Sequence, residues 1–396
     1  MAGAELYLNS ANASQQTPTA ILKSDKRIRI GVAGGVFGAQ FQWHEHPNCT
    51  VEAVTDLIPE RLENLAQVYR CSKTYPSLEE MVRDPNLDAI GVFTGAPDHL
   101  RHSLLCLNAG KHVICAVPCG VNLEECEALL EAVRRTGLHY MMAETLWYHQ
   151  SVITARQWFD EGKFGRIYYS ESEYFHPGIE SYFINPDGSR NWRYGFPPMK
   201  YATHCTAPVV GVTGESFTSV TCTAWGDDSD YLKENVYGNR FCNATAMFHT
   251  DEGNALRAAV WWKGPVGLVE RAEWYGEKMS FCDPHINGIG AIVRRDTEAI
   301  LKSDPAPVRK IIKFEKFDQP AHWQTDMLPA PLRHPSGHDC SHPFLTNEFV
   351  EALVQDRHPA IDIYAALAMT VPGIIAHESA LQGGIQMKIP VYVRPV

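Results

Sequence analysis

The chain has 396 residues, of which 45% are hydrophobic and 20% charged, and its formal net charge is −11. This length exceeds what one hydrophobic core normally serves, so two globular domains are expected, and the negative charge argues against nucleic acid or an anionic membrane surface as a partner. The eleven cysteines form no CxxC pair and no apolar run is long enough to span a bilayer, which together predict a cytoplasmic protein with reduced thiols.

The first segment, residues 1–26, differs in composition from the rest of the chain. It contains few large apolar side chains, which predicts a poorly ordered or surface-draped arm. It has no basic stretch followed by an apolar one, so we expect that it is not a secretory signal.

From residue 27 onward, short strands rich in β-branched residues alternate with helical segments. Strands are predicted over residues 27–35, 50–57, 88–97, 111–118 and 138–148. Helices are predicted over residues 59–70, 76–84, 98–110 and 122–137, and the last two end in glycine, a common helix C-cap. The alternation predicts βαβ units and a doubly wound parallel α/β sheet over residues 27–149.

After residue 150 the pattern changes to longer, aromatic-rich strands with few helices between them. These strands are predicted over residues 166–176, 217–225, 243–250, 255–262 and 268–276. Helical periodicity returns over residues 342–356 and 362–384. We therefore expect a second domain over residues 150–396, of α+β type, with a large and mainly antiparallel open sheet.

The segment "GVAGGVFGAQF" places Gly34, Gly35 and Gly38 between the first strand and an expected helix. Such glycines let the backbone approach a pyrophosphate at a helix N-terminus. The strict G-x-G-x-x-G pattern is not met, because Ala33 occupies its first position. Asp56 ends the second strand, 18 residues after Gly38, where a carboxylate can accept both hydroxyls of the adenosine ribose; a helix N-cap is the alternative. Because a carboxylate repels a 2′-phosphate, NAD is favoured over NADP.

The segment "MKYATHC" places Lys200 four residues before His204. At this spacing two side chains lie on the same side of a helical turn. Taken alone, the pair is either a solvated lysine beside a packed histidine or a proton-transfer pair facing a substrate.

Several segments together make the sequence resemble the Gfo/Idh/MocA (glucose–fructose oxidoreductase / inositol dehydrogenase) superfamily from Arg27 to the C-terminus. They are "RIGVAGGVFG", "VEAVTDL", "FTGAPDHLRHSLLCLNAGKHVIC", "GKFGRIYYSESEY" and "RHPAIDIYAALAMT…ESALQGG". The resemblance implies an N-terminal Rossmann domain, a C-terminal open-sheet domain often used for oligomerisation, and a nicotinamide cofactor between them. It also implies that the C-terminal helix packs back near the first domain.

The resemblance assigns cofactor binding to the glycine-rich turn, the residue after the second strand, and the ends of the later strands. These residues are Gly34, Gly35, Val36, Phe37, Gly38, Asp56, Thr94, Pro97, His99, Ala116, Val117, Pro118 and Glu144.

The sequence departs from typical dehydrogenases of this family at two places. They carry Glu-Lys-Pro where this chain has Ala116, Val117 and Pro118, so the usual catalytic lysine is absent. They also place an Asp four residues before a His, where this chain has Lys200 and His204. We interpret this as relocation of the ammonium group, with Lys200 as the base and His204 sharing or relaying its proton.

This variant pattern is similar to the NAD-dependent glycosidases of the superfamily, the α-N-acetylgalactosaminidase type. Those enzymes have Val-Pro in place of Lys-Pro and a Tyr-Pro-Thr-His segment, where this chain reads "KYATH". The resemblance implies roles for Glu144, Tyr174 and His176, with Tyr174 as the base at C2 of the sugar and His176 or Glu144 assisting aglycone departure or activating water. The alternatives are a structural ion pair for Glu144 and packed residues on the sheet for Tyr174 and His176.

Two further segments are candidates for substrate binding. Arg333, His334 and His338 lie in "RHPSGHDCSH", which we interpret as a loop reaching over the site toward sugar hydroxyls or an anionic group, or as plain loop packing. Its histidine spacing without helical context is a weak metal signal, and we expect no metal. Trp192 and Tyr194 either form a wall of the sugar pocket or pack within a domain core.

The sequence supports three functional hypotheses. The first is an NAD-dependent glycosidase that oxidises C3, eliminates the aglycone, adds water and re-reduces the ketone with tightly bound, recycled NAD. The second is an NAD-dependent sugar or polyol dehydrogenase, and the third a catalytically silent NAD-binding regulatory protein. The expected partners are a small sugar or glycoside and a second copy of the chain, in a dimer or tetramer formed through the C-terminal sheet.

Overall fold

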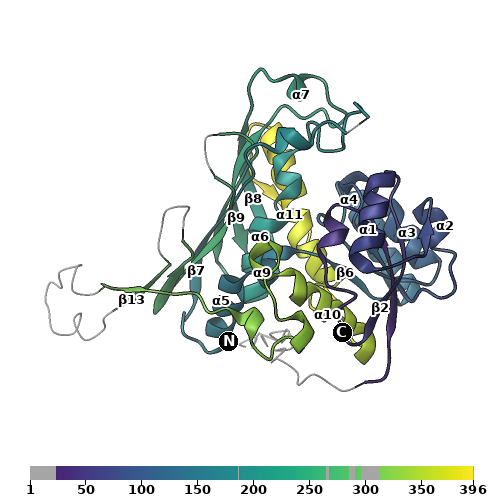
Figure 1. Cartoon of the computed structure of the whole chain (residues 1–396). Coiled ribbons are helices and arrows are strands. Elements are labelled where there is room, and N and C mark those ends of the chain that lie inside the picture. The colour runs from purple at the N-terminus through teal and green to yellow at the C-terminus, as the bar shows by residue number, and fades with distance from the viewer. Residues whose placement is uncertain (1–23, 186, 265–266, 285–289, 296–311, 396) are drawn as a thin grey trace, which may run out of the picture.

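The computed structural model describes residues 24–185, 187–264, 267–284, 290–295 and 312–395 (Figure 1). Most of the expected N-terminal arm, residues 1–23, lies outside these ranges. Two sheets form the frame of the molecule, and helices lie between them (Figure 1). Within the described ranges, none of the helices combines the length and hydropathy needed to cross a bilayer.

The first sheet has six strands in the order β3-β2-β1-β4-β5-β6, and every pair in it is parallel. Its strands are β1 (Ile28–Ala33), β2 (Cys49–Thr55), β3 (Thr74–Tyr75), β4 (Ala89–Val92), β5 (His112–Cys115) and β6 (Tyr140–Met142). Its helices are α1 (Pro59–Tyr69), α2 (Leu78–Met81), α3 (His99–Asn108) and α4 (Leu123–Thr136). The central strands are buried on both faces, as parallel strands covered by helices are. The predicted doubly wound sheet is confirmed, and its order reverses between β1 and β4, where such folds bind ligands.

One predicted helix is absent from this sheet. The glycine-rich turn leads into a four-residue 3-10 helix, η1 (Phe37–Gln40), and the chain then runs without a helix to β2. Phe41 and Trp43 are both fully buried and their rings stack at 5.3 Å. Two buried side chains two residues apart point the same way in an extended segment but not in a helix. The prediction that a helix follows Gly38 is therefore wrong.

The second sheet has nine strands in the order β14-β13-β12-β11-β7-β10-β9-β8-β15. They are β7 (Ile167–Phe175), β8 (Phe217–Trp225), β9 (Asn243–Thr250), β10 (Ala255–Trp261), β11 (Val269–Gly276), β12 (Met279–Cys282), β13 (Ala291–Arg295), β14 (Ile312–Lys316) and β15 (Met387–Lys388). Every pair is antiparallel except β7 with β10. The predicted large, mainly antiparallel open sheet is confirmed.

Helices from three parts of the chain pack against this sheet. They are α5 (Gln150–Asp160), α6 (Thr203–Thr213) and α11 (Ile363–Leu381), and α10 (His342–Gln355) lies nearby. The long α11 contacts α6 and β8 of the second domain as well as α4 and β6 of the first (Figure 1). Nearly every residue of α6 is buried, including His204, so this helix presents its side chains to the space between the two sheets.

Candidate active site

The glycine-rich turn packs tightly at the carboxyl end of β1. Gly34 has a φ of +105°, and a Cβ added there would lie 2.2 Å from the carbonyl oxygen of Phe93. A Cβ at Gly35 would lie 2.5 Å from the carbonyl oxygen of Arg61. Only glycine allows this turn to pack so closely on the end of β4 and the start of α1. Val36 is exposed at the turn, whereas Phe37 packs edge-on against Phe93.

Asp56 fixes the same turn from the end of β2. The Gly35 N–H donates to Asp56 Oδ2 at 2.6 Å, and the Ile58 N–H donates to Asp56 Oδ1 at 2.8 Å. The N-cap of α1 is Ile58, so the alternative that Asp56 is the helix N-cap is not what the structure shows. Each carboxylate oxygen has a further lone pair and Asp56 is only half-buried, so these two acceptor oxygens fit the two hydroxyls of an adenosine ribose.

The ends of β4 and β5 are joined by His99. Its Nδ1 lies 2.8 Å from the Pro118 carbonyl oxygen and its Nε2 lies 3.1 Å from the Thr94 carbonyl oxygen. Thr94 Oγ1 in turn lies 2.8 Å from His102 Nδ1. Since both ring nitrogens of His99 face backbone oxygens, this residue positions the two strand ends rather than offering a free nitrogen to a cofactor.

The position of the family's lysine is apolar here. Val117 is 5% exposed and Ala116 is 8% exposed, and both belong to the hydrophobic core around the first sheet. Trp192 reaches this sheet from the second domain, because a Cβ on Gly95 would lie 2.7 Å from Trp192 Cδ1. The carboxyl end of β4 is therefore covered by an indole ring of the second domain.

A buried carboxylate–imidazole pair lies between the two sheets. His204 in α6 donates its Nδ1–H to Glu144 Oε1 at 2.7 Å, and the Leu146 N–H donates to the same oxygen at 2.9 Å. Glu144 is fully buried, and its Oε2 has no hydrogen-bond partner among the described residues. Burial opposes the charged form of His204, but the Glu144 carboxylate outweighs it and raises the pKa of His204 above 6.5.

Two tyrosines enclose this pair. The ring of Tyr174 in β7 lies 4.4 Å from the His204 ring, and the ring of Tyr201 lies 5.3 Å from it. Burial raises the pKa of both phenols, whereas the charge of Arg193 lowers them. His176 follows Tyr174, with ring centroids 6.1 Å apart, and its buried Nδ1 makes no hydrogen bond to a described residue.

Tyr201 and Arg193 were not among the residues predicted from the sequence. Tyr201 precedes His204 by three residues, and Arg193 stands between the two aromatic residues proposed as pocket walls. The Arg193 guanidinium lies 4.2 Å from the Trp192 ring centroid. The sequence signal that could have identified Arg193 is its place as the one cationic residue in the aromatic segment "NWRYGF".

Lys200 does not join this group. It lies in a 3-10 helix, η5 (Pro198–Tyr201), and α6 begins only at Thr203, so the spacing of four residues does not place it on one helical face with His204. Burial lowers its pKa, and the opposing charges that act on it are those of Glu378 and Glu125. Among the described residues, no hydrogen bond or ion pair joins Lys200 to His204. His204 is therefore bonded to Glu144 and not to Lys200, and the catalytic role of Lys200 stays a prediction.

The remaining predicted substrate residues lie in different surroundings. Tyr194 packs edge-on against Phe183 at 5.7 Å, His334 bonds Glu45 Oε2 at 2.5 Å, and the Arg333 Nε–H donates to the Leu328 carbonyl oxygen at 2.8 Å. Each of these three therefore has a protein partner outside the Glu144–His204 group.

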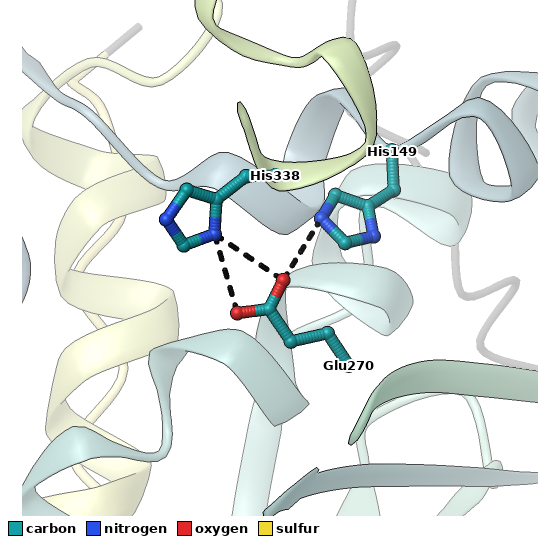
Figure 2. Close-up of side chains that lie close together, drawn as sticks. All are labelled: His149, Glu270 and His338. Atoms are coloured by element: carbon teal, nitrogen blue, oxygen red, sulfur yellow. Dashed lines mark hydrogen bonds and ion pairs between the residues drawn. The ribbon is translucent and has the colours of Figure 1, made fainter. Parts of the chain in front are cut away.

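His338 lies in the short helix α9 (Gly337–Cys340) and contacts Glu270 of the second sheet. Its Nδ1 lies 3.2 Å from Oε1 and 3.3 Å from Oε2 of Glu270, and His149 Nε2 lies 3.3 Å from the same Oε2 (Figure 2). Glu270 in β11 stands opposite Tyr174 in β7, so the two side chains share one face of the sheet. A cavity of about 850 Å³ adjoins this group, and its lining includes Gln40, His149, Glu270, Asp283, His338 and Asp339.

Comparison with known proteins agrees with this geometry. Residues 28–144 match the oxidoreductase family with an NAD-binding Rossmann fold. Trans-1,2-dihydrobenzene-1,2-diol dehydrogenase of Macaca fascicularis is 34% identical over 120 residues, which cover 30% of this chain and 35% of that protein. The matched stretch thus spans about a third of such a relative's length. A glycosyl hydrolase family 109 protein of Streptomyces coelicolor is 23% identical over 401 residues, covering 93% of this chain and 82% of that protein.

A solved structure shows the same fold over nearly the whole chain. Scyllo-inositol dehydrogenase from Lactobacillus casei, with bound NAD(H) and scyllo-inositol, superposes with a TM-score of 0.67 at 18% identity, covering 92% of this chain and 99% of that one. The predicted resemblance is thereby confirmed: residues 28–144 match the Gfo/Idh/MocA oxidoreductase family, which is described by its NAD-binding Rossmann fold.

Proposed function

We propose that this chain is an NAD-dependent enzyme acting on a sugar or glycoside, and that it works as a glycosidase through transient oxidation of its substrate. The observation that carries the proposal is the buried Glu144–His204 pair, enclosed by Tyr174 and Tyr201, beside a strand end that holds Val117 instead of a lysine. The extended similarity to a glycosyl hydrolase family 109 protein supports the same assignment.

The first domain offers a place for NAD. The glycine-rich turn and Asp56 would hold the adenosine half, and the segment from Val117 to Pro118 with Glu144 would face the other half. When bound, NAD supplies an acceptor for a hydride that can be returned to the same substrate, so we expect it to be retained through purification.

Asp56→Asn is expected to weaken NAD binding by about 10- to 100-fold, because the charged hydrogen bonds to the ribose become neutral. The amide oxygen can still accept from the Gly35 N–H, so the turn should remain folded. Calorimetric titration with NAD and with NADP measures the change. Glu60→Gln, on the first turn of α1, is the control; unchanged NAD affinity in Asp56→Asn would exclude this role.

The His204 imidazole is placed to accept a proton from a substrate hydroxyl. Its Nδ1–H is held by Glu144, which leaves Nε2 for the substrate, and the carboxylate stabilises the imidazolium that forms. The arrangement is that of a general base with an orienting carboxylate.

Tyr174 is proposed to act on the neighbouring carbon-bound proton. Burial keeps its phenol protonated, so Tyr174 can serve as a base only if a cation stabilises the phenolate. Burial leaves the pKa of this phenol and of Tyr201 raised, and the charge of Arg193 offsets part of that rise. We therefore assign Arg193 to the activation of Tyr174, and His176 to the departure of the aglycone or the activation of water.

The contrast between Lys200 and Tyr201 tests which neighbour of His204 takes part. Lys200→Met is expected to leave kcat nearly unchanged, because the carboxylates whose charges act on Lys200 are Glu378 and Glu125 rather than Glu144. Tyr201→Phe is expected to lower kcat by about tenfold through loss of the hydrogen bond between its hydroxyl and Arg193. Steady-state kinetics on both variants measure these changes in kcat. A large loss of kcat in Lys200→Met but not in Tyr201→Phe would identify Lys200 as the base.

A plain sugar or polyol dehydrogenase is the second candidate, because the Glu144–His204 pair alone suffices to remove a hydroxyl proton. Purified protein can be incubated with an aryl glycoside in deuterated water. The glycosidase predicts aglycone release with deuterium at C2 and no net NADH, whereas steady NADH formation from a free sugar supports the dehydrogenase. Tight NAD without turnover of any sugar supports a silent regulatory protein.

We further propose that the chain is a cytoplasmic homo-oligomer, a dimer or tetramer that joins through the open face of the nine-stranded sheet. Met247 and Arg257 stand opposite one another there, on the face away from Tyr174. Light scattering on the purified protein measures the number of subunits.

A further inference from the structure

Three side chains from distant parts of the sequence converge beside the Glu144–His204 group. His149 precedes α5, Glu270 lies in β11, and His338 lies in α9, just before α10. Their donor atoms, one from each residue, all lie within 4.8 Å of one another. Figure 2 shows the Glu270 carboxylate between the two imidazole rings, with a nitrogen of each ring directed at it.

The distances within this cluster are long for hydrogen bonds to a charged group. The nitrogen–oxygen separations are 3.2 and 3.3 Å, whereas charge-assisted hydrogen bonds are usually about 2.7–2.9 Å. Two ligands bonded to one metal ion at about 2.0–2.2 Å, at tetrahedral or octahedral angles, lie roughly 2.9–3.5 Å apart. The distances from each histidine to Glu270 thus match those between ligands of a shared ion.

One of the three donor groups is also unsatisfied without an ion. His149 is 5% exposed, and its Nε2 makes no hydrogen bond of acceptable geometry to any described residue. The Glu270 side chain is 10% exposed, and its ion-pair partners among the described residues are these two histidines. Leaving a buried carboxylate with only long contacts is unfavourable, and a divalent cation removes that cost.

The two histidines are held in place by the backbone next to them. The Gln150 N–H donates to Asp339 Oδ2 at 2.8 Å, and Gln150 Nε2 donates to the Asp339 carbonyl oxygen at 3.0 Å. These bonds join the residue after His149 to the residue after His338. The spacing of the two imidazoles is therefore fixed by protein contacts, as a preorganised ligand set requires.

The cluster borders the cavity of about 850 Å³, and Glu270 also lies near the proposed catalytic group. Glu270 shares a sheet face with Tyr174, and the ring of Phe37 in the glycine-rich turn lies 6.0 Å from the His338 ring. His338 is the most exposed of the three side chains and opens onto the cavity of about 850 Å³. An ion here would keep coordination positions free toward this cavity.

We propose that His149, Glu270 and His338 bind a divalent transition-metal ion, with Zn²⁺ or Mn²⁺ as the class of occupant. Two histidines with one carboxylate and open positions form a ligand set of catalytic metal sites. The ion would coordinate a hydroxyl or carbonyl oxygen of the sugar and polarise it; only this second statement rests on the proposed function. The inference departs from the expectation that the chain holds no metal. That expectation considered only the histidine-rich segment, and two of the three proposed ligands, His149 and Glu270, lie outside it.

Cobalt(II) is a suitable probe, since its visible absorption reports coordination by protein ligands without any need for activity. The full-length protein, treated with chelator and dialysed, is titrated with Co²⁺ in the absence of NAD and sugar. One equivalent is expected to bind with new visible bands and to be displaced by Zn²⁺. Glu270→Gln and His338→Gln are expected to lower the Co²⁺ affinity by at least about tenfold. Replacing a residue that only hydrogen-bonds a metal ligand already lowers metal affinity by that factor.

The matched control is His334→Gln, in the same loop, which bonds Glu45 and should bind Co²⁺ like the parent protein. Thermal melts show whether each variant is folded, and added metal should raise the Tm of the parent but not of Glu270→Gln. No saturable binding to the folded parent, or equal binding by folded Glu270→Gln, would overturn the proposal. Neither Co²⁺ absorption nor the Tm depends on turnover. These measurements therefore test the metal site independently of the glycosidase assignment.

Discussion

Replacing His204 with asparagine is expected to lower kcat by about 100- to 10,000-fold, the range for loss of a positioned general base. His204 Nδ1–H donates to Glu144 Oε1, and the asparagine amide can make a similar bond. The variant should therefore fold while losing Nε2, the nitrogen available to the substrate. Steady-state kinetics on the best glycoside or sugar, together with a thermal melt, measure the effect.

The control for this variant is His377→Asn. His377 is also a buried histidine on a helix between the sheets, but it lies on α11 toward Lys200. Its replacement should leave kcat close to that of the parent. If both variants lose the same activity, the loss reflects packing of buried histidines rather than proton transfer.

The pH dependence gives a second test of the same pair. Because Glu144 raises the pKa of His204 above 6.5, activity that needs the neutral ring should rise as pH passes this raised value. In Glu144→Gln only burial and weaker charges remain, so the rising limb should move to lower pH while the maximal rate falls. Rate profiles against pH for both proteins measure the shift. A rising limb at the same pH in both proteins would show that Glu144 does not set the pKa of His204.

The same raised pKa carries a consequence for stability. A histidine whose pKa is higher in the folded state stabilises the fold fully below its unfolded pKa of 6.5, and this contribution is lost as pH rises through the folded pKa. The difference in unfolding free energy between the parent and Glu144→Gln should therefore be largest in mildly acidic solution and shrink toward alkaline pH. Denaturant titrations at several pH values provide the measurement.

The pattern of strands and helices predicted the first domain because its signals are local. β-Branched strands, glycine C-caps and alternating elements follow from a few neighbouring residues, and Gly110 and Gly137 both take the expected positive φ. The helix expected after Gly38 failed for a non-local reason. Phe41 and Trp43 are drawn into the core, where Trp43 meets Phe349 of α10, and this favours an extended segment over a helix.

The site shows the same division between local and distant information. Glu144, Tyr174 and His204 were each identified from motifs, but their pairing was not, since Glu144 and His204 lie 60 positions apart. The spacing of Lys200 and His204 suggested one helical face, and the 3-10 turn before α6 rotated Lys200 away and Tyr201 in. Helix α6 itself has no polar face, so periodicity could not predict it.

Tyr174→Phe is expected to separate oxidation of the substrate from elimination of the aglycone. If the Tyr174 phenolate removes the C2 proton, its loss should lower aglycone release by about 100- to 10,000-fold. Oxidation at C3 needs only the Glu144–His204 pair, so it should still proceed once per active site. Stopped-flow absorbance should then show a single burst of reduced nicotinamide that does not decay, with no deuterium at C2 of the recovered sugar.

Arg193 makes this prediction more specific, because burial alone would keep the Tyr174 phenol protonated. Arg193→Met should reproduce the phenotype of Tyr174→Phe, and Arg193→Lys should recover part of the rate, with the remaining activity requiring higher pH as the phenol becomes harder to ionise. Tyr194→Phe, at the next position but packed against Phe183, is the control and should release the aglycone normally. Full deuterium incorporation by Tyr174→Phe would assign the base to another group, and His176, whose buried Nδ1 has no described partner, would take its place.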